Sequence, residues 1–399
     1  MVRRRASYAP ALNAGFQATA SSVQEMHEAI SGKAFDHLVR VPGLSMPTRI
    51  VQGVHDAITQ GVYAAVRHGG NVALSMAAGV ESLTVDPQRV IGTREQAVRS
   101  AFNGAFGDSL ATHGSGLAIS MGLHANGAPL LPGSEASAAL RARVCVFVHG
   151  LACDEQSWAL RSEAWNATPW ADSLPAGHAV QYGELLEHEL GLSAVYLRYN
   201  TGLSIDANSQ QLAELLERLS QAAPRVVDWA LVGHSMGGLV ARRAHELAAG
   251  QGLRWAKRTS QIVCLGSPHQ GAPLEKLGRA AAGALAFSDV TRPLARIANA
   301  RSQGIKDLRR GLAKKKGAAL KSPALRLVYA TLGDETTGAI GSFVGKMFGD
   351  GLVMAGSASD VGQEGDVEPV EIAGLGHMAL LNHPRVYAVL RRWFGARAG

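Results

Sequence analysis

One serine stands at the junction of two apolar stretches, in the run Gly233-His-Ser-Met-Gly237. The stretch before it, residues 226–232, predicts a buried strand, and residues 236–248 predict a helix, so Ser235 lies in a sharp strand-to-helix turn. Flanking glycines leave room for such a turn. The first N–H groups of the helix would favour an oxyanion beside the serine. We interpret Ser235 as a nucleophile; the alternative is a glycine-rich turn that carries a solvated serine.

A second turn supplies the hydrogen-bond donors that such a nucleophile needs. Residues 143–148 form a continuous apolar run, typical of a central strand buried on both faces, and the run ends in His149-Gly150. Attack of a serine on an acyl group creates a tetrahedral oxyanion, which must be met by backbone N–H groups already in place. We predict that the N–H groups of Leu151 and Met236 form this oxyanion hole. The alternative is an ordinary turn from strand to loop.

A serine hydroxyl becomes a strong nucleophile only when a base removes its proton and an acid orients that base. In chains with this type of turn, the acid and then the histidine follow the serine. We predict His377 as the base because it follows the last predicted strand, whereas His383 precedes a proline and is expected to begin the final helix. Asp334 and Asp350 both stand in loops where the acid belongs, and spacing alone does not separate them.

Strands alternate with helices along the rest of this region, which predicts a mostly parallel, doubly wound α/β sheet. A β-hairpin is expected around the turn pair Asn126-Gly127. Further strands are predicted at residues 192–199, 260–266, 324–330 and 367–372, hairpin strands at 117–123 and 128–131, and an amphipathic helix at 206–222.

The patterns divide the chain into two regions. Residues 1–113 predict a helical N-terminal region, in which one helix runs over residues 93–111 with Thr93 as its N-cap. Residues 114–399 form the predicted catalytic domain. Within it, residues 274–322 form a basic insertion that we interpret as a helical cap or lid.

The amino-acid composition indicates which class of protein this chain belongs to. A hydrophobic fraction of 47% and a charged fraction of 18% over 399 residues are typical of a soluble globular enzyme. The sequence contains no uninterrupted run of about 18 apolar residues, the length needed to span a membrane. The first residues are basic but lack the apolar stretch of a signal peptide, so we expect a cytoplasmic protein. Cys145, Cys153 and Cys264 are expected to be reduced core thiols.

The net charge of +7 is concentrated in one segment. Between Arg292 and Lys321 there are ten basic residues and one acid, Asp307. We expect no nucleic-acid partner, because no nucleic-acid-binding motif accompanies this charge. The segment predicts either peripheral contact with an anionic membrane surface or a solvated basic face.

Six motifs together resemble bacterial α/β-hydrolases of the lipase and carboxylesterase type, over about residues 115–396. They are Val148-His-Gly-Leu151, Tyr199-Asn-Thr-Gly202, Gly233-His-Ser-Met-Gly-Gly238, Gly266-Ser-Pro-His-Gln-Gly-Ala-Pro273, Gly349-Asp-Gly-Leu-Val353 and Gly376-His-Met-Ala-Leu-Leu381. The resemblance implies the α/β-hydrolase fold. It also implies Asp350 as the triad acid, because in similar lipases an Asp-Gly-Leu-Val element carries that residue. The segment 266–273 is expected to line the site, and the expected substrate-binding residues are His149, Gly150, His234, Pro268 and His269.

The expected activity is hydrolysis of carboxylic esters, as in an esterase or lipase, through Ser235, His377 and Asp350 and an acyl-enzyme intermediate. The substrate would be an ester or a lipid. No cofactor and no metal are expected, since the acids at positions 360–366 near the final histidine lack a defined ligand spacing. Two alternatives stay open: an acyltransferase or thioesterase with the same triad, and a non-catalytic module that binds lipid or a protein partner.

Overall fold

The computed structural model describes most of the region after residue 91. The described ranges are 92–112, 114–171, 173–174, 180–272, 302–311, 323–332 and 365–396, with Val353, Ala358 and scattered residues between Gln17 and His68. By its chain contacts the protein divides into a smaller unit (Met1–Val90 with Ser109–Ala118) and a larger unit (Ile91–Asp108 with Ile119–Gly399). The predicted boundary near residue 114 stays a prediction.

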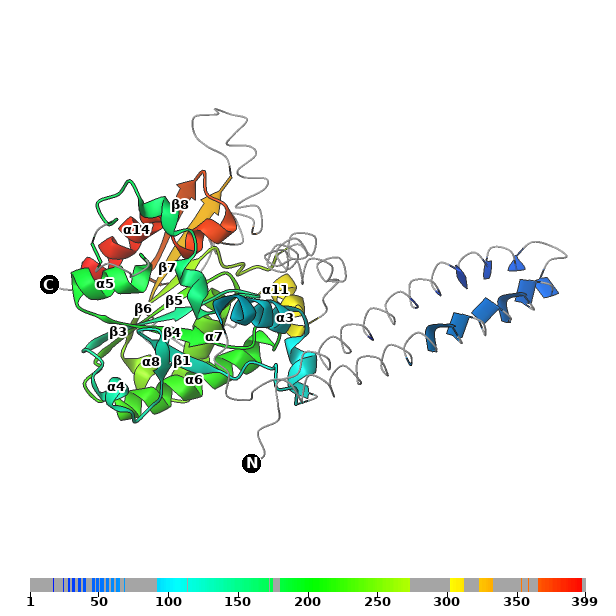
Figure 1. Cartoon of the computed structure of the whole chain (residues 1–399), viewed down its shortest axis with the longest axis horizontal. Coiled ribbons are helices and arrows are strands. Elements are labelled where there is room, and N and C mark those ends of the chain that lie inside the picture. The colour runs from blue at the N-terminus through cyan, green and yellow to red at the C-terminus, as the bar shows by residue number, and fades with distance from the viewer. Residues whose placement is uncertain are drawn as a thin grey trace. The chain divides into compact units, whose positions relative to one another are not determined.

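An eight-stranded sheet forms the centre of the larger unit (Figure 1). Its strands are β1 (Gly122–Ala125), β2 (Ala128–Leu130), β3 (Arg143–Val148), β4 (Ser193–Arg198), β5 (Asp228–His234), β6 (Thr259–Leu265), β7 (Ala324–Thr331) and β8 (Val367–Ala373). The spatial order is β2-β1-β4-β3-β5-β6-β7-β8. Strands β3 to β8 pair in parallel, whereas β1 pairs antiparallel with β2 and β4. The predicted mostly parallel sheet is therefore confirmed.

The predicted hairpin is present at the edge of this sheet, with shorter strands than expected. Asn126 and Gly127 both have positive φ angles, 50° and 73°, as a two-residue type I′ turn requires. Residues 117–121, which we predicted to extend the first strand, precede β1 and belong to no strand. The apolar residues there are buried outside the ladder, which is why the pattern alone suggested a longer strand.

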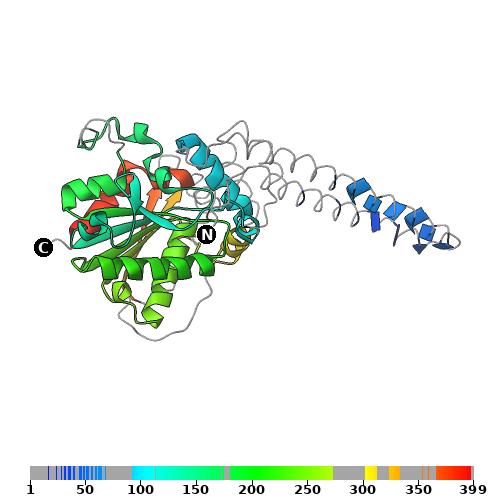
Figure 2. The same ribbon diagram turned by 60° about the horizontal axis from the view of Figure 1, so that its bottom comes forward.

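Helices cover both faces of the sheet. They are α3 (Thr93–Thr112), α4 (Glu135–Ala138), α5 (Tyr182–Leu190), α6 (Ile205–Ala222), α7 (Met236–Gly250), α8 (Arg254–Lys257), α11 (Gln303–Arg310) and α14 (Pro384–Gly395), with 3-10 turns η1 (Glu155–Ala159), η2 (Ser162–Trp165) and η4 (His377–Leu381). Figure 2 shows α6 and α7 on one face and α5 and α14 on the other.

The apolar strand β3 explains this layering. Val144, Val146 and Val148 pack with residues of α6 and α7, while the alternate residues Cys145 and Phe147 pack with residues of α5 and α14. Because successive side chains of a strand point to opposite faces, a strand buried on both must be apolar throughout. The predicted helices α6 and α7 are confirmed, whereas α5 was missed.

Two details of the helix ends concern the predictions. Helix α3 begins at Thr93, and the carbonyl of Gly92 accepts a hydrogen bond from the N–H of Gln96, so Gly92 rather than Thr93 occupies the cap position. His383 is the N-cap of α14, and its Nδ1 accepts from the N–H of Arg385. The expectation that His383 begins the final helix is confirmed.

In the smaller unit, the described residues from Ser45 to His68 are helical, as expected for the N-terminal region. Among the residues that the structure describes, no helix has the length and apolar character needed to cross a membrane. The three cysteines, all in the larger unit, are buried and unbridged.

Candidate active site

Ser235 occupies a strained turn between β5 and α7. Its backbone angles are φ 54° and ψ −123°, a combination that residues with a Cβ rarely adopt. The N–H of Ser235 donates to the carbonyl of Leu265 at the end of β6 (2.9 Å), and its own carbonyl accepts from the N–H of Gly238 (3.2 Å). Neighbouring strand and helix therefore hold the serine in this conformation, at the carboxyl end of the sheet.

Close backbone packing at the turn explains the flanking glycines. A Cβ at Gly233 would lie 2.4 Å from the Cα of Gly238, and one at Gly237 would lie 2.1 Å from the carbonyl oxygen of Val148. Real Cβ atoms do not approach so closely, so a larger residue would push α7 away from β3 and β5. The Gly-x-Ser-x-Gly spacing is thus required by the first turn of the helix.

The loop after β3 lies directly against the serine. A Cβ at Gly150 would lie 3.0 Å from the Cβ of Ser235. The carbonyl of His149 accepts a hydrogen bond from the hydroxyl of Tyr199 (2.7 Å), and the N–H of Ala152 donates to Thr201 Oγ1 (3.0 Å). The loop that contains Leu151 is therefore fixed from both sides.

His377 lies beside the serine turn. It begins η4 after β8, is 5% exposed, and has its ring centroid 4.7 Å from that of His234. The Nε2 of His234 is 3.1 Å from the carbonyl oxygen of His377, and because a carbonyl only accepts, this nitrogen carries the proton. The structure thus brings together Ser235, its neighbour His234, the loop of Gly150 and His377.

The predicted substrate-binding histidine His149 is a fully buried, neutral side chain. Its ring stacks on Tyr199 at 4.5 Å between centroids, and Nδ1 donates to the carbonyl of Gly150 (3.0 Å). Burial lowers the pKa of His149 to about 4, against a usual value of 6.5, so the ring is uncharged at neutral pH. Within the described part of the chain, Nε2 has no hydrogen-bond partner.

His269 follows β6 and is held by the helix that Ser235 begins. The guanidinium of Arg242 in α7 donates to Nδ1 of His269 (2.7 Å). Burial, and then the charge of Arg242, lower the pKa of His269 well below its usual value, so this ring is also neutral. Pro268 is buried, and its carbonyl accepts from the N–H of Gly271 (3.0 Å). Substrate contact by these residues stays a prediction.

Other predicted residues lie outside the described ranges. These are both acids considered for the triad, Asp334 and Asp350, and most of the predicted cap, of which residues 302–311 are described. Across the described residues, no group of three or more His, Cys, Asp or Glu side chains is arranged to hold a metal ion.

Sequence reasoning gave no role to three side chains at this edge: Tyr199, Thr201 and Arg242. The first two belong to the motif Tyr199-Asn-Thr-Gly202. The signal that could have revealed them is their position at the end of a predicted strand and just after it, where loops often carry functional groups. Arg242 had no such signal, because α7 also carries Arg243, His245 and Glu246 and the sequence does not show which of these side chains is buried.

The sheet order, the serine turn after β5 and the loop after β3 together define one architecture. A family model described as the PGAP1-like alpha/beta domain matches residues 141–281, which contain both the turn and the loop. The chain has the α/β-hydrolase fold. In this fold the serine turn lies at the carboxyl end of the sheet.

Solved structures resemble this chain at low sequence identity. The mature lipase BlEst2 from Bacillus licheniformis is 18% identical, with 64% of this chain and 93% of that chain covered and a TM-score of 0.43. A lipase-esterase related protein from Clostridium acetobutylicum is 10% identical (64% and 94% covered, TM-score 0.38). A thermophilic esterase from Thermogutta terrifontis is 14% identical (69% and 93% covered, TM-score 0.36). No curated protein sequence matches the chain. The chemistry of the site therefore follows from its own geometry.

Relief of the backbone strain at Ser235 should stabilise the fold. A residue in such a region costs about 1–3 kcal/mol, and glycine adopts it freely but loses about 0.5–1 kcal/mol through chain entropy. We expect Ser235→Gly to raise the free energy of unfolding by about 1 kcal/mol in urea denaturation. Ser235→Ala, which keeps the Cβ, is the control and should show no such gain. Equal stability of the two variants would contradict the strain.

The neutral ring of His149 should make the fold sensitive to acid. The pKa of His149 is about 4 when folded, below its usual 6.5, so the unfolded chain binds a proton in this interval that the folded chain does not. The contribution of the neutral His149 ring to the free energy of unfolding is therefore fully present above pH 6.5 and is lost as the pH falls below it. Between about pH 7 and about pH 5 this loss should be roughly 2 kcal/mol. Urea denaturation of His149→Gln should show a correspondingly smaller decrease over that interval.

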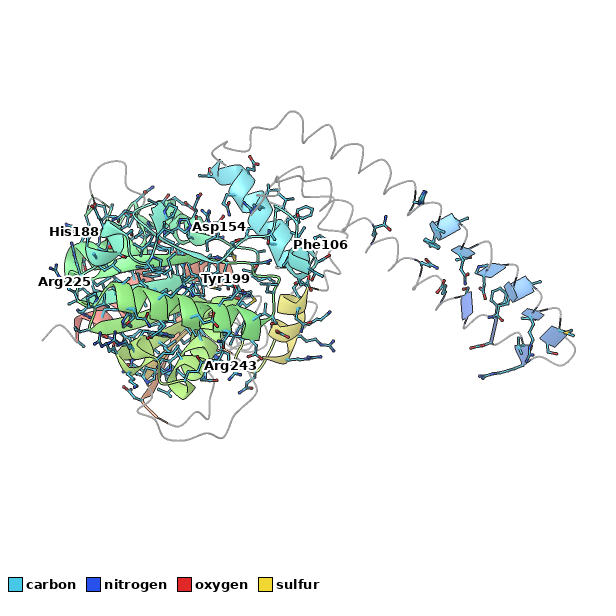
Figure 3. The ribbon with its side chains drawn as sticks, turned by 90° about the horizontal axis from the view of Figure 1, so that it is seen from below. Phe106, Asp154, His188, Tyr199, Arg225 and Arg243 are labelled. Carbon is cyan, nitrogen blue, oxygen red and sulfur yellow. The ribbon has the colours of Figure 1, made fainter. Side chains whose placement is uncertain are left out.

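The control for this experiment is His188→Gln, which changes an exposed histidine on α5 (labelled in Figure 3). Its stability should depend on pH as in the parent. If His149→Gln and the parent lose the same free energy on acidification, His149 is not held neutral by burial.

Proposed function

We propose that this protein is a serine hydrolase that cleaves carboxylic esters. The observation that carries the proposal is the strained conformation of Ser235, with the loop of Gly150 packed against it and His377 packed against its neighbour His234. Strain of this kind persists only where the surroundings enforce it, and it is concentrated at active sites. A turn that only connected β5 to α7 would gain nothing from it.

In the proposed reaction, His377 removes the proton of the Ser235 hydroxyl, and Oγ forms a bond to the ester carbonyl carbon. The carbonyl oxygen becomes an oxyanion that the N–H groups of Leu151 and Met236 hold. The C–O bond to the alcohol breaks, and the alcohol leaves with the proton from His377. Water, deprotonated by His377, then attacks the carbonyl carbon of the acyl-enzyme. The bond from this carbon to Oγ breaks, the acid leaves, and His377 returns the proton to Ser235. Asp350 is the proposed acid that orients the imidazole.

The surroundings of Ser235 support this assignment. Met236 is the first residue of α7, so its N–H has no carbonyl one turn earlier in the helix to bind, and it lies at the positive end of the helix dipole. Ser235 and His377 are each 5% exposed, and the exclusion of water strengthens hydrogen bonds to a developing charge. His234, through its bond to the carbonyl of His377, is proposed to position the histidine loop.

A thiol near the loop is not a rival nucleophile. Cys153 is buried, and desolvation raises the pKa of its thiol to about 12. At neutral pH the group is therefore protonated, and the thiolate is the reactive form of cysteine.

Ser235→Ala and His377→Ala should each lower kcat for p-nitrophenyl esters by about 10⁴-fold or more, because the two residues act as one unit. A series from short to long acyl chains, with and without emulsified triglyceride, should separate esterase from lipase specificity. His383→Ala is the matched control: it removes a helix cap, costs about 1 kcal/mol of stability, and should retain the activity. Turnover only when a thiol or alcohol acceptor is added would instead indicate a transferase.

Substitution of each candidate acid should show, by its effect on kcat, which of Asp350 and Asp334 orients the histidine. Asp350→Asn should lower kcat by about 10⁴-fold, because the amide no longer fixes the tautomer of the imidazole. Asp334→Asn should leave kcat within about threefold of the parent if that residue does not orient the histidine. The same p-nitrophenyl ester assay measures both, and the opposite order would transfer the role to Asp334.

A further inference from the structure

Helix α3 precedes the segment that the PGAP1-like family model matches, yet its residues 100–107 pack on the loops of the proposed site. Two glycines, Gly104 and Gly107, stand in the interior of this helix. Glycine weakens a helix relative to alanine, so its presence there calls for a packing reason. Both glycines meet loops that follow neighbouring strands.

Gly104 contacts the residue that follows the proposed oxyanion donor. A Cβ at Gly104 would lie 2.8 Å from the Cβ of Ala152 and 2.9 Å from its Cα. Ala152 has a positive φ of 62°, a conformation that favours glycine and must be enforced by its surroundings. Because the peptide of Ala152 is joined to Leu151, the backbone of α3 limits where the N–H of Leu151 can lie.

Further contacts join α3 to this loop. The hydroxyl of Ser100 donates to Asp154, the N-cap of η1 (3.4 Å). A Cβ at Gly107 would lie 1.8 Å from the side-chain oxygen of Asn200, whose amide donates to the carbonyl of Gly107 (2.8 Å). Asn200 precedes Thr201, which holds the N–H of Ala152. Figure 3 locates these parts: Phe106 marks α3, Tyr199 the end of β4, and Asp154 the loop after β3.

Helix α11 holds α3 from a second direction. The hydroxyl of Ser302 donates to the carbonyl of Gly104 (2.8 Å), and the N–H of Gln303 donates to Asp108 (2.9 Å). A Cβ at Gly304 would lie 2.2 Å from the carbonyl oxygen of Thr201. The two helices lie side by side in Figures 1 and 2. With α11 bonded to the same peptide of α3, the helix cannot retreat from a larger side chain at position 104 without breaking these bonds.

We propose that Gly104 is a positioning residue for the oxyanion hole: the helix backbone at Gly104 sets the place of Ala152 and thereby of the Leu151 N–H. This inference rests on the proposed function, because it assigns Leu151 to an oxyanion. A methyl group at position 104 would displace Ala152, and the N–H of Leu151 would move away from the oxyanion while the substrate still binds. The interaction lost belongs to the transition state, so kcat should fall and KM should not.

The test is Gly104→Ala in the full chain, assayed with a p-nitrophenyl ester. We expect kcat to fall about 10- to 100-fold, less than the about 10²- to 10³-fold for removal of a whole oxyanion donor, with KM within about twofold. Affinity for phenylboronic acid, which forms a tetrahedral anion with the serine, should weaken by a similar factor. Ala97→Gly is the control: Ala97 is exposed on α3, and the change weakens the helix without touching the loop.

A second change tests the contact itself. Ala152→Gly removes the methyl group that Gly104→Ala would strike and suits the positive φ at that position. In the double variant the close approach to the Cα of residue 152 (2.9 Å) remains, so kcat should recover only in part, by about threefold, as the glycine backbone yields to the new methyl group. Separate structural effects would not produce such a coupling. Simple additivity of the two changes would overturn the proposed contact.

Hydrogen exchange of the segment that contains Gly150 to Cys153 provides a readout independent of turnover. It should be faster in Gly104→Ala and unchanged in Ala97→Gly. If the parent cleaves the ester and Gly104→Ala has the same kcat, the positioning role alone is overturned. A parent that cleaves no ester would overturn the proposed function and the catalytic part of this inference, and exchange would still show whether α3 holds the loop.

Discussion

The unfavourable backbone conformation of Ser235 is the constraint on which the rest of the site depends. It persists because α7 starts within backbone contact of β3 and β5, where only glycine fits at positions 233 and 237. A hydrogen bond to the end of β6 fixes the same residue. Three parallel strands must therefore be in register before the serine can be presented, so the site forms only when the centre of the sheet has formed.

Two buried histidine rings near the serine turn are neutral. His149 and His269 are buried and uncharged, and each has one ring nitrogen committed, to a main-chain carbonyl or to Arg242. Neutral rings avoid the large cost of burying an unpaired charge. Such an environment also keeps water away and preserves the strength of the main-chain donors proposed for the oxyanion.

Helices α3 and α11 also hold the loops at the carboxyl end of the sheet. Loops after β3 and β4 bind one another through Tyr199 and Thr201, and both contact the middle of α3. Helix α11 bonds to the same turn of α3. Loops carry functional groups in this fold but are mobile when left alone, so a packed helix on each side gives them a defined geometry.

The sequence by itself determined the features that arise within a few residues of chain. The apolar run of β3, the turn at Asn126-Gly127 and the glycine-flanked serine were all predictable, because periodicity and turn chemistry are local. The position of His377 after the last strand was predictable as well, whereas its role as the base stays a prediction. Only the tertiary structure decided the strand order, the bond between Arg242 and His269, and the contact of Gly104 with Ala152. These join residues far apart in the chain, and a glycine in a helix does not show from its own neighbours which backbone will pack against it.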